Sequence, residues 1–267
     1  MIAPETVTAL IRETAAAVIL PRFRALAPDQ IREKKPGDFV TIADVESEEM
    51  LERLLTRALP GSVVCGEEGV AKDPSRLSLL EGDAPVWVLD PVDGTSNFAH
   101  GREGFAVIVA LVDHGVTRTG WIHDPRTGVT VHAERGGGAW IGGARVTVDG
   151  SLPLTQQSGS AYGRLGKRGE AAKLLVDRGA VAAIRNTGCG GLDYILMARG
   201  ETHFKYSSAS LPWDHAAGML IMAEAGAAAR FADASPYDVH RHASPLLIAP
   251  GETSWSELHT LLMGSGA

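Results

Sequence analysis

The feature that most constrains this chain is an apolar run that ends abruptly in two acids. The run Val86 to Leu89 leads directly into Asp90, Pro91, Val92, Asp93 and Gly94. A short apolar run bounded by turn residues is typical of a buried strand, and a loop held by such a strand often carries functional groups. Pro91 fixes its own φ, and Gly94 lets a ligand approach the backbone closely. We therefore predict a strand that presents Asp90 and Asp93 in a set geometry.

Two carboxylates at one turn are suited to hard divalent cations such as Mg²⁺, which prefer oxygen ligands. Two ions that share a bridging carboxylate can clamp a phosphate group, and Asp90 is the better candidate for the bridge. Gly94, Thr95 and Ser96 follow, and they are predicted to open a short helix whose free amides accept phosphate oxygens. The alternative is an ordinary polar turn, because Asp-Gly pairs are common in turns.

Four further acidic residues also have a structural alternative to a catalytic role. Glu67 and Glu68 follow the apolar run 63–65 and Gly66, where adjacent acids usually mean a solvated loop. Asp214 precedes an apolar helical segment, so it could simply complement a helix dipole. Asp44 lies three residues after Thr41, the spacing of a capping box.

The first half of the chain is predicted to contain two helices on a mainly antiparallel sheet. Helical spacing of apolar residues covers 4–24, where Pro21 kinks or ends the helix, and 44–59, with a polar loop around Lys34 to Gly37 between them. Short apolar runs at 62–65, 86–89, 105–112, 116–123, 129–132 and 138–141 are predicted to be strands.

The second half alternates strands with helices, which is typical of a layered α/β unit. Strands are expected near 159, 181–184, 203–206, 227–231 and 246–249, and helices near 167–176, 191–198, 213–225 and 254–263. Ser254 and Glu257 have capping-box spacing for the last helix. We expect a metal-binding α+β subdomain over 1–145 and an α/β subdomain over 146–267 that completes the site.

Composition excludes several classes of function. The net charge is -7 and the longest basic run is a pair, which argues against nucleic-acid binding. No apolar stretch approaches the roughly 20 residues of a membrane span, and no signal peptide is evident, so a cytoplasmic location is expected. Cys65 and Cys189 lack metal-binding or redox spacing.

Taken together, these segments resemble the inositol monophosphatase family of magnesium-dependent, lithium-sensitive phosphatases. The resemblance spans essentially the whole chain and rests on four motifs in matching order. The motifs are Asp38-Phe39-Val40-Thr41-Ile42-Ala43-Asp44, Gly66-Glu67-Glu68, Asp90-Pro91-Val92-Asp93-Gly94-Thr95-Ser96-Asn97-Phe98 and Trp213-Asp214-His215-Ala216-Ala217-Gly218. The family fold is an αβαβα sandwich, and homodimers are common in it.

The resemblance implies a role for each of these residues. Two to three Mg²⁺ ions, for which Mn²⁺ can substitute, are expected on Glu67, Asp90, Asp93, Asp214 and the Val92 carbonyl. Thr95 and Asp44, with Glu67, are expected to activate water for direct in-line attack on a small phosphate monoester. The phosphate is expected to lie on Gly94, Thr95 and Ser96.

The resemblance weakens on the substrate side. Family members that bind inositol often carry an acid at the position held here by Ser207, and Cys189 stands where a hydroxyl residue is frequent. Both residues are expected to face the substrate, as is one of Lys205 and Tyr206. Histidinol phosphate, sugar bisphosphates and 3'-phosphoadenosine 5'-phosphate therefore remain alternative substrates. A non-catalytic scaffold is disfavoured because every expected acid is present.

Overall fold

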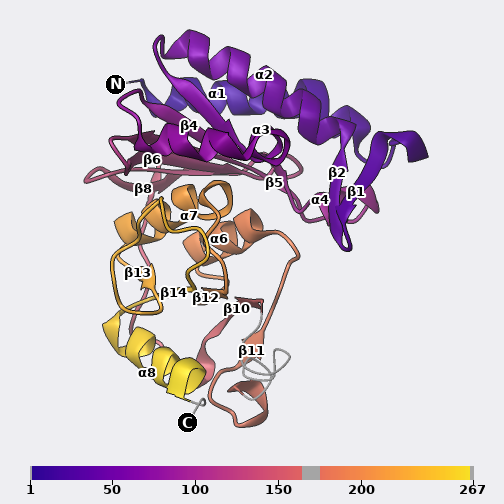
Figure 1. Cartoon of the computed structure of the whole chain (residues 1–267). Coiled ribbons are helices and arrows are strands. Elements are labelled where there is room, and N and C mark those ends of the chain that lie inside the picture. The colour runs from indigo at the N-terminus through magenta and orange to yellow at the C-terminus, as the bar shows by residue number, and fades with distance from the viewer. Residues whose placement is uncertain (1, 164–174, 265–267) are drawn as a thin grey trace.

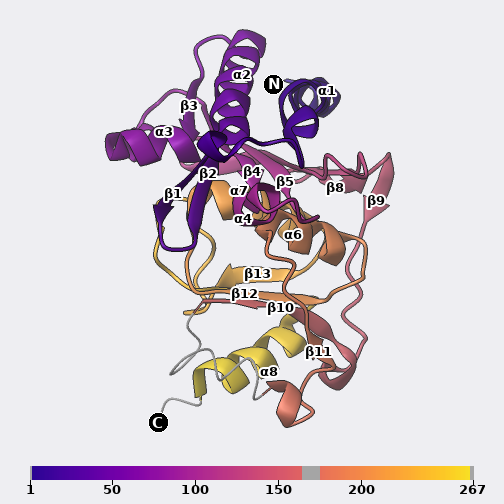
Figure 2. The same ribbon diagram turned by 90° about the vertical axis from the view of Figure 1, so that its right-hand side faces the viewer.

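The computed structural model describes residues 2–163 and 175–264, which form stacked layers of helix and sheet (Figure 1). From one end to the other the layers are α1 with α2, a seven-stranded sheet, α6 with α7, a five-stranded sheet, and α8. Figure 2, turned by 90°, shows the same order of layers. This arrangement confirms the predicted αβαβα sandwich.

The helices of the first half are α1 (Pro4–Thr14), α2 (Ile42–Ala58), α3 (Glu67–Lys72) and α4 (Thr95–Ala99). Those of the second half are α6 (Gly190–Ala198), α7 (Pro212–Glu224) and α8 (Glu252–Met263). A π-helical turn covers Ala15–Ile19, and 3-10 turns cover Leu20–Arg22, Pro28–Gln30, Pro74–Glu81 and Leu154–Gln156. None of the described helices is long and apolar enough to cross a bilayer.

The larger sheet has the strand order β3-β4-β5-β6-β7-β8-β9. Its strands are β3 (Val63–Gly66), β4 (Val86–Asp93), β5 (Ala106–Asp113), β6 (Val116–His123), β7 (Thr130–Glu134), β8 (Gly138–Ile141) and β9 (Ala144–Val146). Only β3 and β4 pair in parallel. The predicted mainly antiparallel sheet is confirmed, with β9 as an additional strand.

The smaller sheet has the order β11-β10-β12-β14-β13 and mixes parallel with antiparallel pairs. Its strands are β10 (Ser158–Tyr162), β11 (Ala183–Ile184), β12 (Phe204–Ser207), β13 (Ala228–Phe231) and β14 (Leu246–Ala249). All five lie close to the predicted positions.

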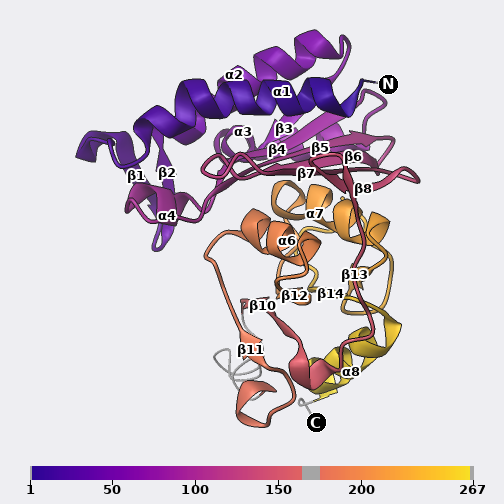
Figure 3. The same ribbon diagram turned by 180° about the vertical axis from the view of Figure 1, so that it is seen from behind.

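Apolar side chains on both faces of the larger sheet hold the layers together. Val7, Leu51 and Trp87 belong to the core beneath α1 and α2, while Ile108 and Ala217 belong to the core between the larger sheet and α6 with α7. Figure 3 shows α6 and α7 lying between the two sheets. The core between the larger sheet and α6 with α7 contains side chains from both halves of the chain, so the two halves share it.

Two glycines allow α7 to pack this closely. A Cβ on Gly120 of β6 would lie 2.7 Å from the Cα of Ala217, and one on Gly218 would lie 2.3 Å from the ring of Tyr194 in α6. Real Cβ atoms do not approach other atoms so closely, and therefore glycine is required at both positions. The close packing fixes the depth of Asp214 beneath the larger sheet.

Three expectations from the sequence need comment. The prediction of a polar loop over Lys34 to Gly37 was wrong for the two lysines, because this segment belongs to a hairpin of β1 (Ile31–Lys35) and β2 (Asp38–Thr41). The capping box at Ser254 was also wrong, because α8 begins at Glu252 and the Ser254 hydroxyl accepts a hydrogen bond from Gln157 Nε2 at 2.7 Å. The helix expected over 167–176 lies mostly outside the described residues.

The division into subdomains 1–145 and 146–267 stays a prediction. The larger sheet ends with β9 at Val146 and the smaller sheet begins with β10 at Ser158.

Candidate active site

Three carboxylates from distant parts of the chain meet at one edge of the larger sheet. Glu67, Asp90 and Asp214 each have an oxygen within 4.8 Å of the others. Because β3 and β4 are parallel and Gly66 pairs with Leu89, the residues that follow these two positions emerge side by side. Asp214 reaches them from the first turn of α7, which packs under this sheet. We call Glu67, Asp90, Asp93 and Asp214 the acid cluster.

The environment of the acid cluster opposes its ionisation. Burial, with the neighbouring acids, raises the pKa of Asp90 and of Asp214 well above the usual range. Burial also raises the pKa of Glu67, although Lys34 opposes this shift. Closely spaced buried carboxylates repel one another unless a proton or a cation neutralises them. All the side-chain atoms available as metal ligands here are carboxylate oxygens, which suit a hard divalent cation.

Asp93 links the two halves of the chain. Its Oδ2 accepts hydrogen bonds from the Cys189 thiol at 3.0 Å and from the Gly191 amide at the start of α6. Burial raises the pKa of Asp93, and these two hydrogen bonds oppose the shift. The second half therefore orients this carboxylate.

Asp44 combines the two roles that its sequence context left open. Its Oδ2 accepts hydrogen bonds from the amide of Thr41 at 2.8 Å and from the hydroxyl of Thr41 at 2.5 Å, which confirms the capping box of α2. Its Oδ1 lies 3.1 Å from Thr95 Oγ1, which can donate to it. Burial raises the pKa of Asp44 to about 7, although the bonds from Thr41 oppose the shift. Asp44 thus has one oxygen that caps a helix and one that faces Thr95.

The turn after β4 brings backbone groups to the same place. Thr95 Oγ1 also lies 3.0 Å from the Val92 carbonyl oxygen, so its single proton has two possible acceptors. Gly94 has φ of 86° and precedes α4, and a Cβ on it would lie 2.6 Å from the Gly104 carbonyl oxygen. Thr95 and Ser96 form the first turn of α4, where amides have no partner within the helix. The predicted short helix is confirmed.

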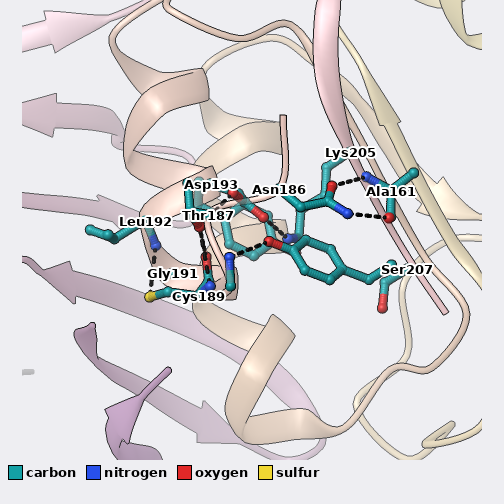
Figure 4. Close-up of polar contacts among 12 residues, drawn as sticks. Ala161, Asn186, Thr187, Cys189, Gly191, Leu192, Asp193, Lys205 and Ser207 are labelled. Carbon is teal, nitrogen blue, oxygen red and sulfur yellow. Dashed lines mark hydrogen bonds and ion pairs between the residues drawn. The ribbon is translucent and has the colours of Figure 1, made fainter. Parts of the chain in front are cut away.

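The residues expected to face the substrate lie on the second-half side of the cluster. Cys189 is buried, and its sulfur also accepts a hydrogen bond from the Leu192 amide at 3.4 Å (Figure 4). Ser207 donates to the Ala209 carbonyl oxygen at 2.9 Å. Lys205 lies near the acid cluster, whereas Tyr206 packs in the core beside α8. Substrate contacts of Cys189 and Ser207 stay a prediction.

Two residues at the site were missed from the sequence. Lys34 Nζ contacts Glu67 Oε1 at 3.0 Å and Glu68 Oε1 at 3.1 Å. Glu48 accepts hydrogen bonds from the Glu68 amide at 2.8 Å and the Gly69 amide at 2.6 Å, so it holds the start of α3. Lys34 lies beside Lys35 in a segment predicted to be a loop, so no local signal shows which of the two lysines faces Glu67.

Three histidines near the site or next to β12 have structural partners. His215 is buried, its Nδ1 lies 2.9 Å from the Tyr194 hydroxyl, and burial lowers its pKa to about 3. His100 contacts the Ser96 carbonyl oxygen at 2.7 Å, and His203 contacts the backbone of Ser158. His215 is thus a neutral core residue beside Asp214.

Comparisons with known proteins agree with this geometry. A family model described as "Inositol monophosphatase family" matches residues 4–264. An inositol-1-monophosphatase of Rhizobium meliloti is 36% identical over 202 residues, which cover 74% of this chain and 73% of the relative. A Thermotoga maritima protein named fructose-1,6-bisphosphatase/inositol-1-monophosphatase is 32% identical over 196 residues, covering 73% and 72%.

The fold is also found among solved structures. A structure of a Thermotoga maritima IMPase superposes with a TM-score of 0.81 at 25% identity, and the match covers 97% of each chain. The chain therefore belongs to the inositol monophosphatase family, and it is a phosphatase that hydrolyses phosphate monoesters.

Proposed function

We propose that this phosphatase is Mg²⁺-dependent and that the acid cluster, with the Val92 carbonyl, holds two to three ions. The observation that carries the proposal is the meeting of Glu67, Asp90 and Asp214 oxygens within 4.8 Å. When bound, the ions supply Lewis-acid stabilisation of the phosphate and lower the pKa of water. They also neutralise carboxylates whose ionisation burial opposes. Mn²⁺ is expected to substitute for Mg²⁺.

Thr95 and Asp44 are proposed to position the attacking water and accept its proton. Thr95 can donate its hydroxyl proton to Asp44 Oδ1, which leaves the Thr95 oxygen free to accept a proton from water. Burial raises the pKa of Asp44 above that of an ordinary carboxyl group, which makes it a stronger base. Attack is then direct, without a covalent phosphoenzyme.

The start of α4 is proposed to bind the phosphate. The amides of Gly94, Thr95 and Ser96 lie at the positive end of that helix, beside Asp93. Helix N-termini bind phosphate oxygens through free amides and the local dipole. A protein with a net charge of -7 can attract an anion in this way.

The proposed substrate is a small polyol phosphate such as an inositol monophosphate. This choice is supported by the names of the relatives, both of which include inositol-1-monophosphatase, and one of which also includes fructose-1,6-bisphosphatase. Histidinol phosphate, sugar bisphosphates and 3'-phosphoadenosine 5'-phosphate stay as alternatives because Ser207 offers a hydroxyl where an acid is frequent.

The test is phosphate release from a panel of these compounds with Mg²⁺, with EDTA, and with Mg²⁺ plus Li⁺. We expect release with Mg²⁺, none with EDTA, and inhibition by Li⁺. Asp90→Asn should abolish release, while Asp83→Asn, at an exposed position before β4, should not change it. Full activity in EDTA would contradict the metal assignment.

We also propose a homodimer in the cytoplasm, on the basis of the family resemblance. Light scattering after gel filtration tests the assembly, and a mass equal to one chain of 28.1 kDa would contradict it. Cell fractionation tests the location.

A further inference from the structure

Lys205 is a fully buried lysine behind the acid cluster. It lies on β12, its side chain is 2% exposed, and its Nζ contacts Asp193 Oδ2 at 2.9 Å. Nζ also lies 4.7 Å from the ring centre of Tyr162 and 5.1 Å from that of Tyr194. A buried ammonium is costly unless it is paired, and here one carboxylate and two aromatic faces surround it.

The loop before α6 places this ammonium close to Asp93. A Cβ built on Gly190 would lie 3.7 Å from Asp93 Oδ2 and 3.8 Å from Lys205 Nζ, so both groups border the same small space. Lys205 favours the ionised forms of Asp93 and Asp214 electrostatically. No side chain of residue 190 separates the positive charge from the acids.

The Asp193 side chain anchors the ammonium. Asp193 is 2% exposed, and its other oxygen, Oδ1, lies 2.8 Å from the Thr187 hydroxyl. Thr187 in turn lies on the loop that carries Cys189, as Figure 4 shows. Lys205 therefore has a fixed position, which distinguishes it from a surface counterion that moves away when a ligand arrives.

We propose that Lys205 is a permanent positive charge at the Asp93 and Asp214 end of the acid cluster, and that it tunes the affinity of this end for a divalent cation. The proposal rests on the proposed metal site. The ammonium stabilises the cluster without metal and weakens metal binding, because like charges repel. Asp193 has the opposite effect, since it partly neutralises the ammonium.

Two single variants should therefore shift metal affinity in opposite directions. Lys205→Met removes the positive charge and should tighten Mn²⁺ binding by about tenfold or more, since tenfold is roughly the effect of one charge on a divalent ion about 7 Å away in bulk water and burial increases it. Asp193→Asn leaves the ammonium with a neutral partner and should weaken Mn²⁺ binding by several-fold. Calorimetry and Mn²⁺ paramagnetic resonance measure both shifts without substrate.

Controls separate this charge effect from damage to the fold. Arg199→Met removes a positive charge from an exposed ion pair with Glu201 after the other end of α6, and it should leave Mn²⁺ affinity unchanged. The double variant Lys205→Met/Asp193→Asn removes both buried charges, and its affinity should lie between those of the single variants. If Lys205→Met does not fold, Asp193→Asn and the double variant still test the proposal.

The outcomes also distinguish this proposal from the proposed function. Shifts in the same direction, or no shift in either folded single variant, would overturn the role of Lys205 while leaving the metal site intact. Absence of Mn²⁺ binding by the unchanged protein, or binding that survives Asp90→Asn, would instead overturn the metal site itself.

Discussion

The two ends of the acid cluster are built differently. At one end, Glu67 and Glu68 pair with Lys34, whose side chain is 21% exposed on the hairpin. At the other end, Asp93 and Asp214 lie near Lys205, which is 2% exposed. We call these the Glu67 end and the Asp214 end.

The difference in exposure separates two kinds of counterion. The Lys34 side chain reaches solvent at the edge of the cluster, so it can move outward when a cation binds Glu67. Lys205 has no such freedom, because it is enclosed by Asp193, Tyr162 and Tyr194. The Glu67 end is therefore suited to exchange ions, and the Asp214 end to hold a constant charge.

The largest expected effect comes from a change at the Asp214 end. Asp93→Asn removes a charged metal ligand but can still accept the hydrogen bonds of Cys189 and Gly191. We expect turnover to fall by about a thousandfold or more, because a neutral amide is a weaker ligand for the ions that would stabilise the transition-state charge. Phosphate release and circular dichroism measure this, and near-normal turnover would refute the role of Asp93.

Glu48→Ala tests the support of the Glu67 end. The substitution leaves the Glu68 and Gly69 amides without their acceptor, and an unsatisfied buried group costs about 1 to 3 kcal/mol. We expect activity to fall about 10- to 100-fold, with a higher Mg²⁺ requirement. Glu48→Gln keeps one acceptor oxygen and should recover part of the activity. Equal loss in both variants would mean that Glu48 does more than hold these amides.

The metal-free protein should lose stability as pH rises through neutrality. Burial raises the pKa of Asp44 and of Glu48 to about 7, above the value of about 4 in the unfolded chain. Such groups stabilise the fold at low pH, and this contribution is lost as pH rises through 7. Burial also raises the pKa of Asp90 and Asp214, which adds to this loss. The histidines whose pKa burial lowers, namely His123, His132 and His215, act in the opposite direction, because they still lose a proton near pH 6.5 in the unfolded chain. The buried acids are more numerous and closely spaced, so between pH 6.5 and 8 melting in EDTA should occur at lower temperature at the higher pH.

Mg²⁺ should counteract this loss. The rise in melting temperature on adding Mg²⁺ is therefore expected to be larger at pH 8 than at pH 6.5. A rise that is the same at both values would show that the ions do not relieve repulsion among these acids.

The smallest effect is expected at Cys189. Cys189→Ser keeps a donor for Asp93 Oδ2, whereas Cys189→Ala removes it. We expect Ser to change activity less than about twofold and Ala to lower it about threefold to tenfold, since one hydrogen bond to a charged group contributes about 1.5 to 3 kcal/mol at most. Steady-state kinetics separates the two, and identical rates would show that this hydrogen bond does not orient Asp93.

The layers and the acid cluster were predictable because both depend on local patterns. Apolar runs such as 86–89 gave the strands, and the acids follow them directly in the sequence. Asp44 also shows that helix capping and a contact with the proposed catalytic Thr95 do not exclude each other, since each of its two oxygens has its own partner.

What the sequence could not indicate depends on contacts between distant segments. Lys34 and Lys35 are adjacent and chemically alike, and only the pairing of β1 with β2 turns Lys34 toward Glu67. Lys205 and Asp193 are 12 residues apart on different elements, so their pairing follows from the packing of α6 on the smaller sheet. Ser254 fits a capping pattern, but its hydroxyl accepts a hydrogen bond from the distant Gln157 side chain.

The order in which the layers are made has a consequence for synthesis of the protein. During translation, residues 63–146 of the larger sheet leave the ribosome before α6 and α7, which cover the face of this sheet opposite to α1 and α2. Until residue 224 has emerged, side chains such as Val88, Ile108 and Ile122 on that face have no covering helix. Exposed apolar sheet faces associate with one another. The nascent chain is thus most in need of chaperones while roughly its first two thirds have been made.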